Sequence, residues 1–115
     1  MKVSQIQKLV KASVLSGQVN ENMEVFKACG ADLMSDVLRF AKEDVILITG
    51  LTNIHTLRTA EMANIQFVLF VRDKEPPAEV IDEAQEAGLT ILKTNLPMYE
   101  TCGILYASGL GKVEG

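Results

Sequence analysis

Nine residues follow the ends of three apolar segments and carry groups suited to holding a small anion. They are a glycine with hydroxyl, amide, guanidinium and carboxylate side chains: Thr49, Gly50, Thr52, Asn53, Arg72, Asp73, Thr94, Asn95 and Tyr99. In open α/β sheets such turns lie at the carboxyl ends of the strands, where ligands usually bind. Backbone N–H groups at the starts of the following helices would favour a negative charge there. The sequence therefore predicts a ligand-binding crevice built from three turns.

The same residues also have an ordinary structural interpretation. Thr and Asn at the start of a helix are common N-caps. Arg72 and Asp73 are adjacent and can form an ion pair with each other, which contributes little at a surface. The sequence alone leaves both interpretations open.

Two acidic residues near the middle of the chain suggest a second kind of chemistry. Asp32 and Asp36 lie one helical turn apart, so they could serve as a carboxylate pair for a metal or for acid–base work in phosphotransfer or acyl transfer. Asp32 or Ser35 is equally the natural N-cap of the helix that begins there.

Reactive side chains outside these groups give no catalytic pattern. Cys29 and Cys102 lack C-x-x-C spacing, and we expect them to be buried, reduced thiols. His55, the only histidine, is expected at a partly exposed helix position. Phosphate-loop, dinucleotide, zinc-protease and serine-hydrolase motifs do not occur. The sequence predicts no catalytic residue, metal or cofactor, and we expect that the protein is not an enzyme.

Three strand–turn–helix units in the second half must position the predicted crevice. Residues 45–49, 67–71 and 89–92 are short apolar runs, as expected of strands buried on both faces. Right-handed crossovers make such strands parallel and bring their turns to one edge. The second helix opens at Pro76 and Pro77 and closes at Gly88, which follows the usual asymmetry of helix ends. The predicted fold is α/β, a layered open sheet that is mostly parallel.

The first half has weaker signals. Ser4 and Gln7 have the form of a capping box, which predicts a short first helix, and strands are predicted at residues 12–15 and 24–29. From Asp32 an apolar stripe at helical spacing predicts another helix. Residues 1–110 are expected to form a single domain, and residues 111–115 a flexible tail.

Composition excludes two classes of partner. The chain has 115 residues and a formal net charge of −4, which argues against a nucleic-acid surface because phosphate contacts need clustered Lys and Arg. No segment approaches the roughly 20 apolar residues of a membrane span, and none resembles a secretion signal. We expect a cytoplasmic protein that contacts neither nucleic acid nor membrane.

Residues 45–106 resemble the DRTGG domain family, and weaker similarity extends upstream through ADLMSDVLRF. The matching pieces are the strand before Gly50, the strand before Pro76 with its helix AEVIDEAQEAG, and the segment LTILKTNLPMYET. Members are small α/β modules, found alone or attached to phosphotransacetylase and CBS-domain proteins, and related in fold to the N-terminal domain of HPr kinase. The resemblance implies a regulatory, non-catalytic role and a homodimer.

Both motifs that name the family are replaced in this chain. Leu51 and Thr52 stand where the Asp-Arg pair follows the glycine, and Val71, Arg72 and Asp73 stand where Thr-Gly-Gly follows the next strand. Arg72 could replace the missing arginine from the neighbouring turn, or the fold could serve protein contacts only. We therefore predict a non-catalytic module that senses a nucleotide or phosphorylated metabolite; the alternative is a ligand-free adaptor domain in a metabolic enzyme complex.

Overall fold

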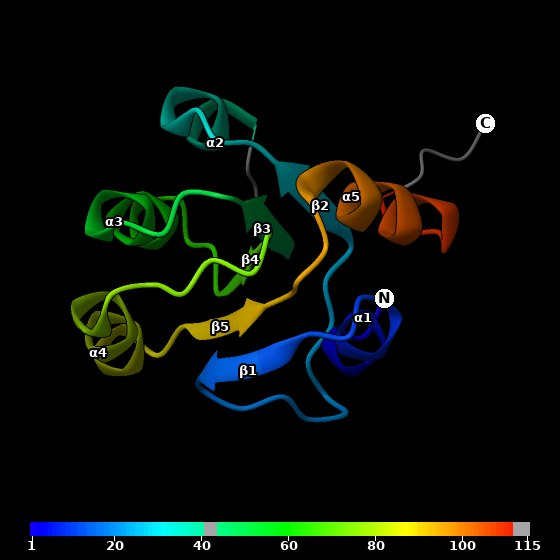
Figure 1. Ribbon diagram of the computed structural model, residues 1–115, viewed down its shortest axis with the longest axis horizontal. Helices are drawn as coiled ribbons and strands as arrows, with labels where there is room; N and C mark the ends of the chain where they lie inside the picture. The colour runs from blue at the N-terminus through cyan, green and yellow to red at the C-terminus, as the bar shows by residue number, and fades with distance from the viewer. Residues whose placement is uncertain (41–43, 112–115) are drawn as a thin grey trace.

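The computed structural model describes residues 1–40 and 44–111, and within them five strands form one sheet (Figure 1). The strands are β1 (Ser13–Ser16), β2 (Lys27–Gly30), β3 (Val45–Thr49), β4 (Phe67–Phe70) and β5 (Thr90–Lys93), in the order β1-β5-β4-β3-β2. From β2 to β5 the neighbours pair in parallel, whereas β1 pairs with β5 in the antiparallel direction. The predicted α/β fold with a mostly parallel sheet is confirmed.

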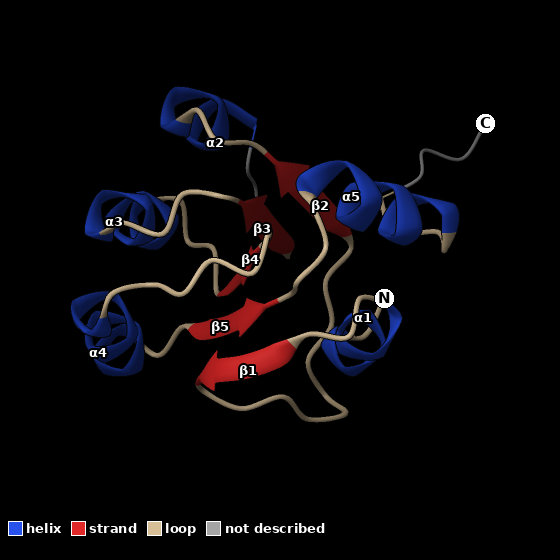
Figure 2. Cartoon of the chain, in the orientation of Figure 1, coloured by secondary structure: helices blue, strands red, loops and turns tan. Residues whose placement is uncertain are grey.

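Helices cover both faces of this sheet (Figure 2). On one face lie α2 (Met34–Phe40), α3 (Ile54–Met62) and α4 (Ala78–Ala87), and on the other lie α1 (Val3–Leu9) and α5 (Met98–Ala107). The crossovers from β2 through β5 all move across the sheet in the same direction, and right-handed crossovers of that kind place their helices on one face. Neither sheet face is left to solvent at its centre.

Alternate strand residues supply two separate hydrophobic cores. In β4, Phe67 and Leu69 join the core beneath α1 and α5, while Val68 and Phe70 join the core beneath α2, α3 and α4. All five residues of β3 are buried. This two-sided burial explains why the central strands read as continuous apolar runs rather than as alternating patterns.

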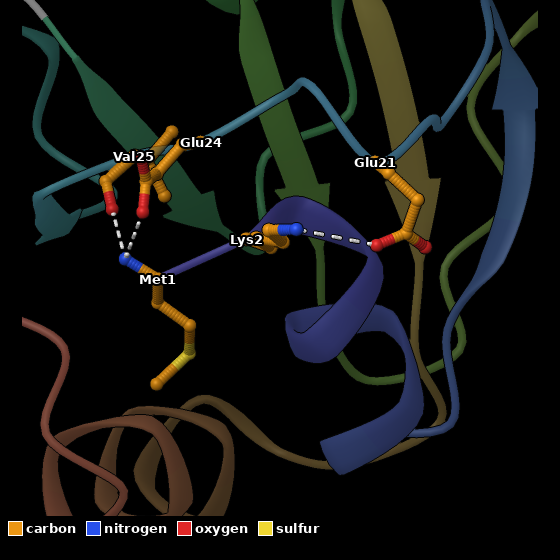
Figure 3. Close-up of polar contacts among 5 residues, drawn as sticks. All are labelled: Met1, Lys2, Glu21, Glu24 and Val25. Carbon is orange, nitrogen blue, oxygen red and sulfur yellow. Dashed lines mark hydrogen bonds and ion pairs between the residues drawn. The ribbon is translucent and has the colours of Figure 1, made fainter.

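The start of α1 differs from the prediction. The helix begins at Val3 with Lys2 at its N-cap position and no side-chain cap, so the capping box predicted at Ser4 is wrong. The Met1 ammonium donates to the Val25 carbonyl oxygen at 2.7 Å (Figure 3). The Val25 N–H donates to the Met1 carbonyl oxygen at 2.9 Å. Pairing with the segment before β2 therefore sets where this helix starts.

Other element ends agree with the prediction to within a few residues. The strand predicted at 24–29 begins at Lys27. Val25, before it, is fully buried in the core beneath α1 and α5, and its N–H donates to Met1. As predicted, α4 starts after Pro77 and ends at Gly88, whose φ of +75° suits glycine.

The boundary predicted at residue 110 stays a prediction. Leu110 is buried in the core beneath α1 and α5, and its N–H donates to the Leu105 carbonyl oxygen at 3.0 Å. Residues 112–115 lie outside the described part of the chain. No helix within the described ranges combines the length and apolar character that crossing a membrane would need.

Candidate functional site

Backbone hydrogen bonds join three predicted turns at the carboxyl edge of the sheet. The Arg72 N–H donates to the Leu96 carbonyl oxygen at 2.8 Å, and the Asp73 N–H donates to the Thr94 carbonyl oxygen at 3.0 Å. The Val71 N–H donates to the Thr49 carbonyl oxygen at 3.1 Å. The turns after β3, β4 and β5 are therefore held together, as their order in the sequence suggested.

Arg72 and Asp73 adopt an unusual backbone conformation in the middle turn. Their φ angles are +63° and +54°, in the left-handed region that costs an L-residue with a side chain about 1–2 kcal/mol. These are also the positions at which the DRTGG motif has its two glycines. The chain keeps a glycine-like backbone here although it carries two charged side chains.

The Arg72 side chain lies directly over Gly50. A Cβ atom at Gly50 would collide with the Nη2 atom of the guanidinium and lie 3.0 Å from its Cζ and Nε atoms. Gly50 therefore permits a close approach between the turns after β3 and β4. Among the described residues, no acidic group lies within ion-pair distance of this exposed guanidinium.

Asp73 forms its ion pair with Lys93. The Lys93 ammonium lies 3.1 Å from the Asp73 carboxylate and 2.8 Å from the Glu75 carboxylate. The hydrogen bonds from the ammonium to Glu75 and Asp73 raise the pKa of Lys93 above its usual value, and the bond to Glu75 has the larger effect. The alternative in which Arg72 and Asp73 neutralise each other is therefore wrong, and the guanidinium is left exposed.

Asp32 ties the turn after β2 to the turn after β3. Its Oδ1 atom accepts hydrogen bonds from the Thr49 hydroxyl at 3.0 Å and from the Gly50 N–H at 2.8 Å. Because α2 starts at Met34, Asp32 lies too early to be its N-cap. Within the described residues no group of three or more His, Cys, Asp or Glu side chains could hold a metal, so a metal site at Asp32 and Asp36 finds no support. Their use as an acid–base pair stays a prediction.

The sequence did contain a signal for the position of Asp32. It follows the end of β2 by two residues, much as Arg72 follows the end of β4. The interpretation as a helix cap assigned it to the element after the turn, whereas its carboxylate contacts the neighbouring turn across the sheet edge.

Three predicted site residues act mainly as structural hydrogen-bonding groups. Thr94 is buried, and its hydroxyl donates to the Val10 carbonyl oxygen at 2.6 Å. Asn53 caps α3, because its side-chain oxygen accepts from the Thr56 N–H at 2.9 Å. Thr49 is likewise buried and bonded to Asp32.

The remaining predicted residues differ in exposure. Thr52 is half-buried, and Asn95 is exposed. Tyr99, in the first turn of α5, is 80% exposed. The side chains that present polar groups to solvent at this edge are thus Asn53, Arg72, Asp73, Asn95 and Tyr99.

A cavity lies between β2 and α5. It has a volume of about 500 Å³ and is lined by Lys27, Ala28, Gly30, Ile48, Cys102, Leu105, Tyr106, Leu110 and Gly111. Two smaller cavities, of about 260 and 300 Å³, lie at the opposite, amino-terminal ends of the strands. The sequence analysis did not predict the groove between β2 and α5, because it depends on how α5 crosses the sheet.

The two thiols are partly rather than fully buried. Cys29 packs against the core beneath α2, α3 and α4, whereas Cys102 packs against the opposite core. Both are free. Burial raises the pKa of both thiols, and the nearby Asp36 carboxylate further raises that of Cys29. The only histidine, His55, is exposed near the start of α3.

Comparisons with known proteins agree with the fold. A family model for the DRTGG domain matches residues 5–108. No curated protein is significantly similar in sequence. A similar solved structure contains the CBS and DRTGG domains of the regulatory region of Clostridium perfringens pyrophosphatase, in complex with the activator diadenosine tetraphosphate. The TM-score is 0.76 and the sequence identity is 18%. The similarity covers 96% of this chain and 48% of that one, so this chain spans about half of that structure.

Proposed function

Because the chain belongs to the DRTGG domain family, we propose that it is a non-catalytic regulatory module that senses a nucleotide or phosphorylated metabolite. The ligand binds at the carboxyl edge of the sheet. The observation that carries this proposal is Arg72, an exposed guanidinium held over Gly50 by a strained backbone. An arginine fork binds phosphate oxygens through two hydrogen bonds and is often used for that purpose.

The surroundings of Arg72 favour an anion. The helices α4 and α5 begin after Pro77 and Pro97, and neither has a side-chain cap. Their first N–H groups therefore face the same edge without a capping oxygen, and helix N-termini attract negative charge. Asn95 and Tyr99 add an amide and a phenol beside them.

The likeness to the pyrophosphatase regulatory region supports the nucleotide class of ligand. That region was crystallised with diadenosine tetraphosphate as its activator. A regulatory role is also what the DRTGG resemblance implies. The nine predicted residues remain the proposed site, in which Thr49, Gly50 and Thr94 hold the turns while the exposed members contact the ligand.

A thermal-shift screen of nucleotides and phosphorylated metabolites tests this function. A ligand at 100 times its Kd stabilises the folded state by about 2.7 kcal/mol, which corresponds to a Tm increase of roughly 11 °C for a domain of this size. Arg72→Ala should abolish most of that shift, and Asn53→Ala should reduce it. Arg58→Ala, which removes an exposed arginine from α3, is the matched control and should leave the shift intact. No shift with any ligand, or an equal loss in Arg58→Ala, would rule against the site.

The outer surface of α5 favours a second candidate, an adaptor that binds protein, including a second copy of the chain. This helix has one charged residue, Glu100, among ten, although a helix on a protein surface normally presents a polar face to water. Tyr99 and Tyr106 are 80% and 61% exposed. A homodimer through this face is expected to dissociate in Tyr99→Lys, measured by native mass spectrometry. A wild-type monomer that retains no partner protein would count against this candidate.

A further inference from the structure

The groove between β2 and α5 exists because β2 has small residues on the face beneath α5. A Cβ atom at Gly30 would lie 2.8 Å from the Cys102 sulfur, so α5 can pack this close only over glycine. Ala28, on the same face of β2, is short and exposed. The resulting floor of small residues leaves a cavity of about 500 Å³, which lies within the range of small-molecule sites.

The groove has apolar walls and a polar rim. Ile48, Leu105 and Leu110 supply apolar surface, and Tyr106 supplies an aromatic ring. Lys27 is exposed at the rim. A ligand that fits must therefore combine an apolar, flat body with polar or negatively charged groups.

The open edge of β2 supplies hydrogen-bonding groups at this rim. The Ala31 N–H donates to the Ile48 carbonyl oxygen at 3.0 Å, and the Lys27 N–H donates to the Asp44 carbonyl oxygen at 3.3 Å. In a parallel ladder the alternate residues turn their N–H and C=O groups the other way. Ala28 therefore presents both a donor and an acceptor at the sheet edge.

A small ligand suits this edge better than an added peptide strand. β2 has only four residues, and a Cβ atom at Gly111 would lie 3.7 Å from the Ala28 nitrogen. The segment after α5 thus already approaches one end of the strand. The remaining edge offers too few free backbone groups for the repeated pairing that strand addition requires.

Gly30 lies at the end of the groove that is nearest in sequence to the turns at the carboxyl edge. It lies two residues before Asp32. The Asp32 carboxylate accepts the Gly50 N–H at 2.8 Å, and the Arg72 guanidinium lies over Gly50. This series of contacts links the Gly30 end of the groove to the proposed anion site.

We propose that the groove between β2 and α5 binds the base of a nucleotide whose phosphate groups bind Arg72. This inference rests on the proposed function and adds the position of the base. The flat ring lies on Ala28 and Gly30 against Tyr106, and the phosphates extend past Asp32 to the guanidinium.

Calorimetric titration of the wild type and two variants tests the two halves of the site separately. The probes are ATP, GTP, CTP and UTP, the corresponding nucleosides, and inorganic tripolyphosphate. Ala28→Leu places a larger side chain in the groove, and we expect it to weaken nucleotide and nucleoside binding at least tenfold without changing tripolyphosphate binding. Arg72→Ala should show the reverse pattern, weakening tripolyphosphate and nucleotide but not nucleoside. Ser13→Leu, a similar enlargement at an exposed position on the other edge strand, is the matched control.

Alkylation of the wild-type thiols by iodoacetamide provides a test that needs no variant. The bound nucleotide should slow alkylation of Cys102, which lines the groove, but not of Cys29, which packs on the opposite side of the sheet. Nucleotide binding that depends on Arg72 but is unaffected by Ala28→Leu, with Cys102 unprotected, would overturn the base site and leave the sensing function standing. If none of the four nucleotides binds, the base site fails, whereas the sensing function fails only if the wider thermal-shift screen also finds no ligand.

Discussion

Replacing Arg72 with glycine should separate the cost of its backbone conformation from the effect of its side chain. At φ of +63°, the left-handed backbone of Arg72 destabilises the folded state by about 1–2 kcal/mol relative to glycine. Glycine in turn loses about 0.4–1 kcal/mol more conformational entropy on folding than alanine does. Arg72→Gly should therefore be more stable than Arg72→Ala by about 0.5–1 kcal/mol. Both variants lack the guanidinium, so its contacts cancel in this comparison.

A neighbouring residue gives a control with the opposite sign. Lys74 is exposed and is not among the residues with positive φ. Lys74→Gly should therefore be less stable than Lys74→Ala by about 0.4–1 kcal/mol. The Gly-minus-Ala difference at position 72 minus the same difference at position 74 cancels the entropy cost of glycine. What remains is the strain of the left-handed backbone, about 1–2 kcal/mol.

Urea unfolding followed by circular dichroism measures all four free energies of unfolding. Equal m-values are required, because a changed m-value indicates a changed denatured state. Against the wild type, Arg72→Gly should gain stability and lose nucleotide binding together. If glycine is no better than alanine at position 72, the strain argument is wrong, and the reason for assigning Arg72 a function is weakened.

Three further predictions concern other parts of the structure. Asp32→Ala should lower the free energy of unfolding, measured with urea, by about 1.5–3 kcal/mol, because the Thr49 hydroxyl and the Gly50 N–H lose their acceptor. The control Asp36→Ala should stay within about 0.5 kcal/mol of the wild type. Gly30→Ala should cost about 1–3 kcal/mol through its contact with the Cys102 sulfur; Cys102→Ala should reverse much of that loss in a double-mutant cycle, and additive effects would contradict the contact. Burial raises the pKa of Cys29 and Cys102 above 9.0, so the native state binds more protons than the unfolded state above about pH 9. The stability that the protonated thiols contribute should therefore be fully present below that pH and fall as pH rises through the raised pKa values. Urea unfolding between pH 8 and pH 10 measures this loss, which should shrink when both thiols are replaced with alanine; an unchanged pH profile would refute the assignment.

The sequence predicted the second half of the fold better than the first for a physical reason. Strands covered on both faces must be apolar throughout, so β3 and β4 were recognisable without knowledge of their neighbours. The ends of α4 depend on local chemistry. Proline is favoured at the start of a helix, where Pro77 lies, and Gly88 ends the helix in a left-handed conformation. In contrast, the start of α1 depends on pairing between Met1 and Val25, which no local pattern specifies.

The candidate site divides in the same way. The order of the units and the right-handed crossover rule were enough to predict that the turns containing Thr49, Arg72 and Thr94 share one edge. Which side chains remain exposed at that edge could not be predicted without the folded chain. The Thr94 hydroxyl donates to the Val10 carbonyl oxygen, and the Asp32 carboxylate accepts from the neighbouring turn. The Arg72 guanidinium lies over Gly50 and has no acidic partner among the described residues. Periodicity records which face of an element is buried, but hydrogen bonds between residues far apart in sequence depend on distances that only the folded chain sets.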